Sequence, residues 1–210
     1  MLGIDVLLSQ YFESHLDDHF GTSVRKKIKD RLFERYGLSL QQSLQQFDIF
    51  EKVLNEFFGN ASKGVLKNLF ESVCTVKKQK TNRKQKTSFI EIKDELLANF
   101  ILKSYGDEDK KSILAVATEN SLTIPEILKK SGLPTSSGYR IFNSLLREGL
   151  MMESLDKTGK SEKARFKSTI REVKVNLAGA KLEITIFLST EALRSSRVLA
   201  TVAPNLTTSA

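Results

Sequence analysis

The stretch from residue 122 to residue 149 constrains the fold of this chain more than any other part of the sequence. Thr123 and Glu126 have the T-x-x-E spacing of a helix capping box, and Pro125 lies between them in the first turn of the helix. Gly132 ends this helix, and a Gly-Leu-Pro turn leads into a second amphipathic helix over residues 135–148. The sequence therefore predicts two helices joined by a tight turn.

The helix over residues 135–148 has two different faces. Its inward stripe is apolar and includes Ile141, Phe142 and Leu145. The other face carries hydroxyl, amide and guanidinium groups, which can donate hydrogen bonds to phosphates and read base edges. These candidate DNA-binding residues are Thr135, Ser136, Ser137, Tyr139, Arg140, Asn143 and Arg147. A polar, outward second helix is typical of a helix-turn-helix motif, in which that helix enters the major groove of DNA.

A basic β-hairpin is predicted directly after this helix. Leu150 to Met152 form its first strand, residues 156–160 form a flexible tip, and Ala164 to Thr169 form the return strand. Such a hairpin, called a wing, brings cations to the phosphate backbone. Its candidate DNA-binding residues are Lys157, Lys160, Lys163, Arg165 and Lys167. A second hairpin with alternating apolar residues is predicted over residues 173–188.

The segment from Leu122 to Glu153 resembles the winged helix-turn-helix of prokaryotic regulators of the ArsR, IclR and TrmB families. The stretch SGLPTSSGYRIFNSLLREGL is especially similar to the IclR pattern of a Gly-Leu-Pro turn, a Ser-Tyr-Arg helix start and a terminal Gly-Leu. The resemblance covers about 50 of the 210 residues. It implies that residues 135–148 read an operator, that a wing at 157–167 touches phosphate or the minor groove, and that the protein is a homodimer. The sequence shows neither an IclR-type effector domain nor an ArsR-type cysteine set, so no inducer or metal is implied.

An N-terminal block, residues 1–76, predicts a bundle of four or five amphipathic helices. Apolar residues recur at three- and four-residue steps before Gly21 and again between Gly21 and Gly37. Residues 39–58 read as one helix or two, and a last helix follows from Asn60. The stretch GLSLQQSLQQFDIFEKVLNEFFG is similar to uncharacterised archaeal regulators. The bundle either offers an apolar face to a second copy or forms a pocket for a small-molecule or protein effector, and the sequence leaves both open.

The net charge of +8 is confined to two segments. Residues 77–88, KKQKTNRKQKTS, hold six cations with no carboxylate and no apolar side chain, and residues 151–210 carry a net charge of +4. We expect 77–88 to be a solvated linker or an exposed helix extension that marks a domain boundary, because it cannot bury itself. It is either a merely solvated segment or an arm that contacts DNA phosphates. A helix is then predicted over residues 92–106. It is either the first helix of the next domain or a linker helix through which two copies dimerise.

No group of residues has the spacing of a catalytic or cofactor site. His15 and His19 are one helical turn apart, as in metal-binding helices, but Leu16 stands where a metallohydrolase has its catalytic Glu, and no third ligand is apparent. The pair is more typical of histidines at a helix edge. Cys74 is the one cysteine of the chain, so it cannot form an internal disulfide, and we expect it in the core. The sequence predicts no enzyme activity, metal or cofactor.

The sequence also lacks targeting signals. The apolar start from Ile4 to Leu8 has no basic n-region or cleavage site, and no apolar run approaches the roughly 18 residues of a membrane-spanning helix. The single cysteine suits a reducing compartment. We therefore expect a cytoplasmic protein without a membrane partner, because its basic segments have little apolar surface.

Together these patterns predict a mainly α fold with a C-terminal winged helix-turn-helix domain of α+β type and an added β-hairpin. The expected divisions are a helical bundle (1–76) for dimerisation or sensing, a basic linker (77–88), the winged domain (89–188) and a polar, partly disordered tail (189–210). The predicted function is sequence-specific binding of double-stranded DNA by a homodimeric transcriptional regulator, with the wing on the DNA backbone. The alternative is a protein–protein interaction module of a transcription or replication assembly, without base readout.

Overall fold

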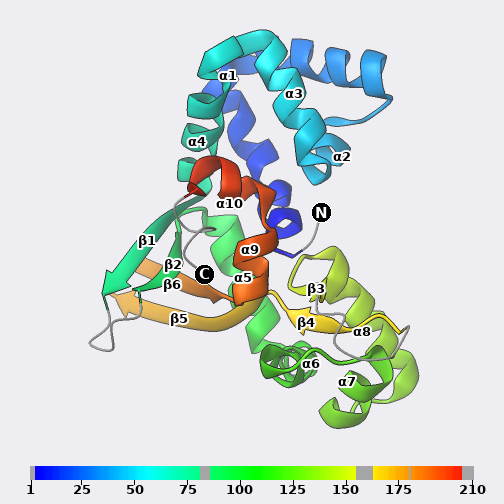
Figure 1. Cartoon of the computed structure of the whole chain (residues 1–210). Helices are drawn as coiled ribbons and strands as arrows, with labels where there is room; N and C mark the ends of the chain where they lie inside the picture. The colour runs from blue at the N-terminus through cyan, green and yellow to red at the C-terminus, as the bar shows by residue number, and fades with distance from the viewer. Residues whose placement is uncertain (1–2, 81–85, 155–162, 180, 205–210) are drawn as a thin grey trace.

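The structure is a computed structural model that describes residues 3–80, 86–154, 163–179 and 181–204. It is mainly helical, with a small antiparallel sheet (Figure 1). The helices are α1 (Ile4–Tyr36), α2 (Leu40–Gln45), α3 (Phe47–Phe58), the short 3-10 helix η1 (Gly59–Ala61), α4 (Ser62–Val73), α5 (Glu95–Gly106), α6 (Glu108–Glu119), α7 (Ile124–Ser131), α8 (Thr135–Arg147), α9 (Thr190–Ser195) and α10 (Arg197–Val202). Across the described ranges, no helix combines the length and the apolar character needed to cross a membrane.

The N-terminal helices follow the predicted glycine pattern and lie together at the top of Figure 1. α1 consists of two helices joined at a kink, where Gly21 has φ 70° and ψ 160°, a conformation available mainly to glycine. Gly37 ends its second half in the left-handed conformation, with φ 65°. The choice left open over residues 39–58 is resolved as two helices, because Ser39 and Gln42 form a capping box that starts α2, and α3 begins separately.

Two hairpins build the sheet. Its order is β1-β2-β6-β5, and all neighbouring strands are antiparallel. The strands are β1 (Cys74–Lys80), β2 (Lys86–Ile92), β5 (Ile170–Ala178) and β6 (Lys181–Leu188), and a separate pair is formed by β3 (Met151–Glu153) and β4 (Phe166–Ser168). The pairing of β5 with β6 confirms the second hairpin predicted from alternating apolar residues.

The prediction of a solvated linker over residues 77–88 is wrong wherever the structure describes this segment, because 77–80 and 86–88 are strand. The reason lies just outside the segment. Cys74 and Ile90 are buried, so both strands begin in the core and continue outward through the polar residues. The segment is therefore the outer part of a β-hairpin, and one buried cluster includes residues from both sides of it.

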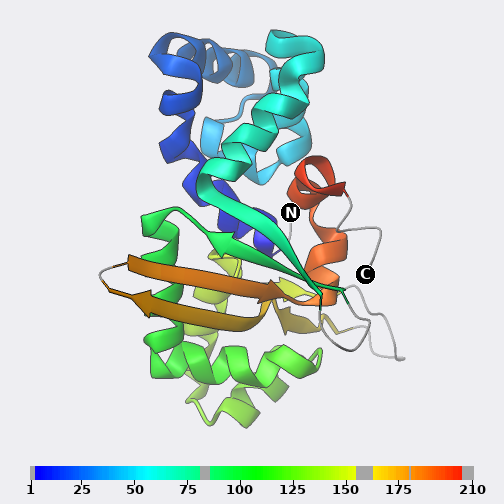
Figure 2. The same cartoon turned by 90° about the vertical axis from the view of Figure 1, so that its left-hand side faces the viewer.

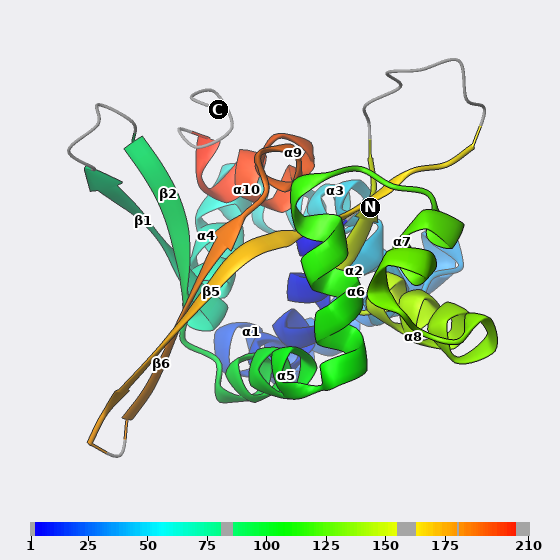
Figure 3. The same cartoon turned by 90° about the horizontal axis from the view of Figure 1, so that it is seen from below.

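The sheet is strongly staggered. β2 pairs with β6 only from Ile90 to Ile92, so the two hairpins overlap at a short junction. From this junction the β1–β2 hairpin extends toward one side of the molecule and the β5–β6 hairpin toward the opposite side, as Figure 2 and Figure 3 show. Ile184 is fully buried at the junction, whereas Val175 and Leu177 near the end of β5–β6 are 47% and 73% exposed. Each hairpin is thus an arm that leaves the core.

The polar tail predicted from residue 189 onward is also wrong as far as residue 204. Ser189 and Ser196 cap α9 and α10, with hydroxyl oxygens that accept hydrogen bonds from backbone N–H groups. Val198 and Leu199 are fully buried. Serine caps followed by apolar residues at helical spacing favour two short packed helices over a tail. The rest of the predicted tail, residues 205–210, lies outside the described residues.

The first turn of α1 holds the C-terminal helices in place. The buried Asp5 carboxylate accepts hydrogen bonds from the Ser196 hydroxyl and from the Arg197 backbone N–H, the latter at 2.9 Å. Burial nevertheless raises the pKa of Asp5, because the loss of hydration outweighs these hydrogen bonds. The two ends of the described chain are therefore joined by a buried polar contact.

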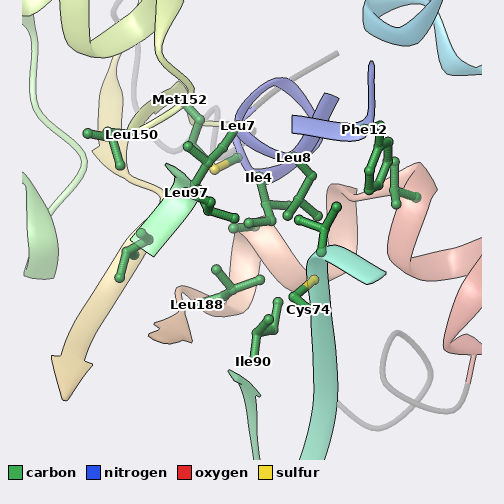
Figure 4. Close-up of a cluster of buried hydrophobic side chains, with 14 of the residues drawn as sticks. Ile4, Leu7, Leu8, Phe12, Cys74, Ile90, Leu97, Leu150, Met152 and Leu188 are labelled. Carbon is green, nitrogen blue, oxygen red and sulfur yellow. The ribbon is translucent and has the colours of Figure 1, made fainter. Parts of the chain in front are cut away.

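The start of α1 lies at the centre of the core. Figure 4 shows Ile4, Leu7 and Leu8 among side chains from β1, β2, β3, β6 and α5, and all three are fully buried. Gly149, just after α8, approaches so closely that a Cβ atom on it would lie 2.5 Å from the carbonyl oxygen of Gly3. The N-terminal helices and the segment predicted as a separate C-terminal domain therefore share one core.

Candidate nucleic-acid interface

The predicted pair of helices joined by a turn is present as α7 and α8. The Glu126 carboxylate accepts hydrogen bonds from the Thr123 backbone N–H at 2.8 Å and from its hydroxyl at 2.9 Å. These bonds lower the pKa of Glu126, and the one from the backbone contributes most. Gly132 ends α7 with φ 72°, and α8 ends at Arg147, one residue before the predicted end. Local capping signals thus fix α7, whereas α8 begins after Pro134 without a side-chain cap.

The inner face of α8 is packed into the core. Phe142 and Leu145 are fully buried, and the Phe142 ring meets Phe166 of β4 edge-on with 5.0 Å between ring centroids. Gly138 faces α7, where a Cβ atom would lie only 2.7 Å from a methyl carbon of Leu128. The absence of a side chain at this position lets α7 and α8 pack closely.

The outer face of α8 presents six of its seven predicted candidates to solvent, namely Thr135, Ser136, Tyr139, Arg140, Asn143 and Arg147. The seventh, Ser137, is half-buried, and its hydroxyl donates to the Pro134 carbonyl oxygen at 3.2 Å. The helix contains two arginines and no acidic residue. The structure therefore gathers six hydrogen-bonding side chains on one exposed face and turns Ser137 toward its own helix.

The C-terminal end of α8 is held by neighbouring helices. The Lys110 ammonium of α6 lies 2.9 Å from both carboxylate oxygens of Glu148, and the Ser144 hydroxyl donates to the same carboxylate at 2.7 Å. The Gln10 amide of α1 donates to the Arg147 carbonyl oxygen at 3.3 Å. These contacts fix the direction in which the outer face of α8 points.

The predicted wing is described only at its base, where β3 and β4 pair. Leu150 to Met152 are fully buried, so the first strand belongs to the core. Lys163 is exposed and Lys167 is half-buried near the start of the return strand. The predicted contacts Lys157 and Lys160 lie outside the described residues.

Arg165 has a structural role that the sequence does not reveal. Its Nε donates to the Ser121 carbonyl oxygen at 3.0 Å, and its guanidinium lies 3.8 Å from the Glu126 carboxylate. Its neighbour Phe166 forms an isolated β-bridge with Leu122. Arg165 therefore ties β4 to the segment before α7, in addition to any contact it makes with a ligand.

Replacing Arg165 by alanine is expected to lower the free energy of unfolding by about 1–2 kcal/mol, since a charge-assisted hydrogen bond to a backbone carbonyl is lost. Arg171→Ala is the matched control, because Arg171 is exposed and should change stability by less than about 0.5 kcal/mol. Urea unfolding of both variants measures the difference. Equal stability of the two variants, together with weaker DNA binding by Arg165→Ala alone, would make Arg165 a DNA contact instead of a structural one.

Sequence reasoning missed Lys130, which lies beside two predicted wing residues. Lys130, Arg165 and Lys167 border an open polar hollow of about 570 Å³, together with the carboxylate of Glu119. A concave surface with three cations can accept a phosphate group. The available signal was the pair Lys129 and Lys130 in the last turn of α7, where cations are common because they interact favourably with the helix dipole.

The structure adds no third metal ligand to the histidine pair among the residues that it describes. Within the described ranges, no three His, Cys, Asp or Glu side chains form a group that could hold a metal. Nε2 of His15 lies 2.7 Å from the Asp94 carboxylate, which also caps α5 by accepting from the Leu97 N–H, while His19 is exposed. Cys74 is confirmed as a core residue, and burial raises the pKa of its thiol, which disfavours the reactive thiolate.

The N-terminal helices carry one open hollow that bears on the predicted effector. It has a volume of about 450 Å³ and lies between the second half of α1 and the start of α2. Phe33, which is 72% exposed, lines it together with Lys29 and the carboxylates of Glu13, Asp30 and Glu34. An effector at this hollow stays a prediction.

Comparisons with known proteins give no family assignment. No protein-family model matches the chain, and neither a curated protein nor a solved structure matches it. The resemblance to winged regulators therefore stays a prediction, and the function has to be inferred from the residues and their geometry.

Proposed function

We propose that this protein is a transcriptional regulator that binds double-stranded DNA through a winged helix-turn-helix, with α8 in the major groove. The observation that carries the proposal is the outer face of α8, on which Tyr139, Arg140, Asn143 and Arg147 are all exposed. Arginine and asparagine side chains make the bidentate contacts that distinguish guanine and adenine from other bases. α8 also has no acidic residue that would repel the phosphates on either side of a DNA groove.

The contacts that fix α8 to the rest of the protein support the same proposal. Base readout requires a helix whose orientation is fixed before it meets DNA, because loose side chains lose entropy on binding. Phe142 holds the inner face of α8 in the core, and Glu148 with Lys110 holds its end. The hydroxyl of Ser136 and the positive end of the helix dipole are available to a phosphate at its start.

The wing completes the proposed interface. Lys163 and Lys167, at the base of the β3–β4 hairpin, and Lys130 of α7 add cations beside α8 that suit the DNA backbone. As in the families that the sequence resembles, we expect a homodimer on a palindromic site with half-sites about one helical turn, or 34 Å, apart. The stoichiometry on such a duplex tests this expectation.

Replacing Arg140 and Asn143 by alanine is expected to cost about 1–3 kcal/mol of base discrimination per residue, because each side chain loses its contacts to base edges. The control variant Asn99→Ala/Lys103→Ala removes one amide and one cation from the exposed side of α5. The measurement begins with selection of bound sequences from a random duplex pool at two salt concentrations. Affinity for selected and random duplexes is then compared among the variants.

Binding of the selected duplex by the Arg140→Ala/Asn143→Ala variant with wild-type affinity and preference would contradict base readout by α8. The absence of any duplex binding by the wild-type protein would contradict the proposed function as a whole. Thermal unfolding of the two double variants is measured alongside. Their melting temperatures should equal that of the wild-type protein, because the four replaced side chains are all exposed.

A further inference from the structure

The outer part of the β1–β2 hairpin concentrates positive charge on a projecting arm. We call residues 77–80 and 86–88 the basic arm. Segment 77–88 as a whole holds six Lys or Arg residues and no Asp or Glu. Four of these lysines stand in the strands: Lys77, Lys78, Lys80 and Lys86. Residues 81–85 lie outside the described residues, so the inference rests on the strand residues alone.

The stagger of the sheet takes this charge away from the core. β2 pairs with β6 only from Ile90 to Ile92, so the basic arm extends past β6 with β1 and β2 paired only to each other. Figure 1 and Figure 3 both place the hairpin on the opposite side of the molecule from α8. The arm is therefore a second basic feature, distinct from the outer face of α8.

The many cations of the hairpin do not help it to fold. Lys80 and Lys86 are paired across the two strands, and like charges at directly opposed positions destabilise a hairpin. Among the arm side chains that the structure describes, Lys77 forms an ion pair with Glu91, at 2.5 Å. Glu91 itself lies outside the charged segment. A polyanion bound along the arm would offset the repulsion that strand pairing creates.

We propose that the basic arm binds the phosphate backbone of duplex DNA as a contact separate from that of α8. This inference rests on the proposed function, because it assumes that DNA is the polyanion. A membrane surface is a poorer match, since segment 77–88 has no apolar side chain that could enter a bilayer. Lysine ammonium groups bind phosphates as point charges and need no fixed geometry, which suits an arm without a built pocket.

The test measures how DNA affinity depends on salt. The arm variant is Lys78→Gln/Lys80→Gln/Lys86→Gln in the full chain. The control variant, Lys26→Gln/Lys27→Gln/Lys52→Gln, removes the charges of three exposed lysines from α1 and α3. Binding to a duplex of about four helical turns, or ~40 base pairs, is measured from low to high salt for both variants, wild type and Arg140→Ala/Asn143→Ala.

Each phosphate contact contributes about 0.9 to the slope of log affinity against log salt. The arm variant is therefore expected to flatten that slope by about 2–3 and to bind about 10- to 100-fold more weakly at 0.1 M salt. The control variant should keep the wild-type slope. A further variant, Lys78→Arg/Lys80→Arg/Lys86→Arg, keeps the charge and should also keep the slope, which separates loss of charge from damage to the hairpin.

The outcomes separate this inference from the proposed function. A wild-type slope in the folded arm variant, with weaker or less selective binding by Arg140→Ala/Asn143→Ala, would overturn the role of the arm alone. A flattened slope in the arm variant, with wild-type behaviour of the α8 variant, would support the arm and contradict base readout by α8. If the arm variant loses binding to phosphatidylserine–phosphatidylcholine vesicles but not to DNA, the arm serves a membrane and the inference is wrong.

Discussion

Replacing Gly149 by alanine is expected to lower the free energy of unfolding by about 3–5 kcal/mol. Two causes act together. Gly149 has φ 77°, which costs an alanine about 1–2 kcal/mol. A Cβ atom there would also lie 2.5 Å from both the Gly3 carbonyl oxygen and the Leu7 backbone nitrogen. Backbone atoms cannot rotate away as a flexible side chain can, so either α8 or the start of α1 has to move.

Two glycine controls isolate these causes in urea unfolding experiments. Gly132→Ala meets a similar φ of 72° with no atom within 4 Å of the new Cβ, so it should cost only about 1–2 kcal/mol. Gly64→Ala lies in α4 in open space and should stabilise the protein by about 0.5–1 kcal/mol. If Gly149→Ala lowers the free energy of unfolding no more than Gly132→Ala does, that result would contradict the close approach of α1 to the end of α8.

This close approach gives the N-terminal helices a physical connection to the candidate DNA-reading helix. The backbone of the fully buried Leu7 lies against Gly149, two residues past the end of α8, and Gln10 donates a hydrogen bond to the last carbonyl of α8. A displacement of α1 therefore cannot leave α8 in place without opening the core. An effector or partner that moves α1 would change the direction of the outer face of α8, which connects the predicted sensing role of the N-terminal helices to the proposed interface.

The features that were predictable from sequence depend on neighbours along the chain. Gly21, Gly37 and Gly132 all have positive φ at the predicted helix ends, because a left-handed or kinked position favours glycine regardless of the tertiary structure. The outer face of α8 follows from helical periodicity in the same way. The buried Phe142 and the exposed Arg140 therefore lie on the faces that the sequence predicts.

The features that were missed depend on distant residues. Ile90 pairs with Ile186, almost one hundred positions later, and this pairing turns the predicted linker into part of a sheet. No local pattern in a run of lysines and polar residues indicates that its two ends are anchored in this way. Arg165 binds the carbonyl oxygen of Ser121, 44 residues away, so its structural role was equally hidden. Basic residues near a wing therefore need the structure before structural roles and DNA contacts can be told apart.

Replacing Phe142 by alanine is expected to cost about 3–5 kcal/mol of unfolding free energy, because the loss of a fully buried ring leaves a cavity and removes the edge-on contact with Phe166. Phe142→Leu keeps most of the volume and should cost less than about 1.5 kcal/mol. Phe33→Ala is the exposed control and should change stability by less than about 0.5 kcal/mol. Urea unfolding measures all three variants.

The position of Phe142 also gives this variant a functional consequence that differs from that of Arg140→Ala. Arg140→Ala should weaken base discrimination at full stability, whereas Phe142→Ala should lose binding to selected and random duplexes alike as α8 detaches from β4. Lowering the temperature should restore DNA binding to Phe142→Ala but not base discrimination to Arg140→Ala, because only the first defect arises from stability. Unfolding of Phe142→Ala at the same urea concentration as Phe33→Ala would show that α8 is not held to the core through this ring.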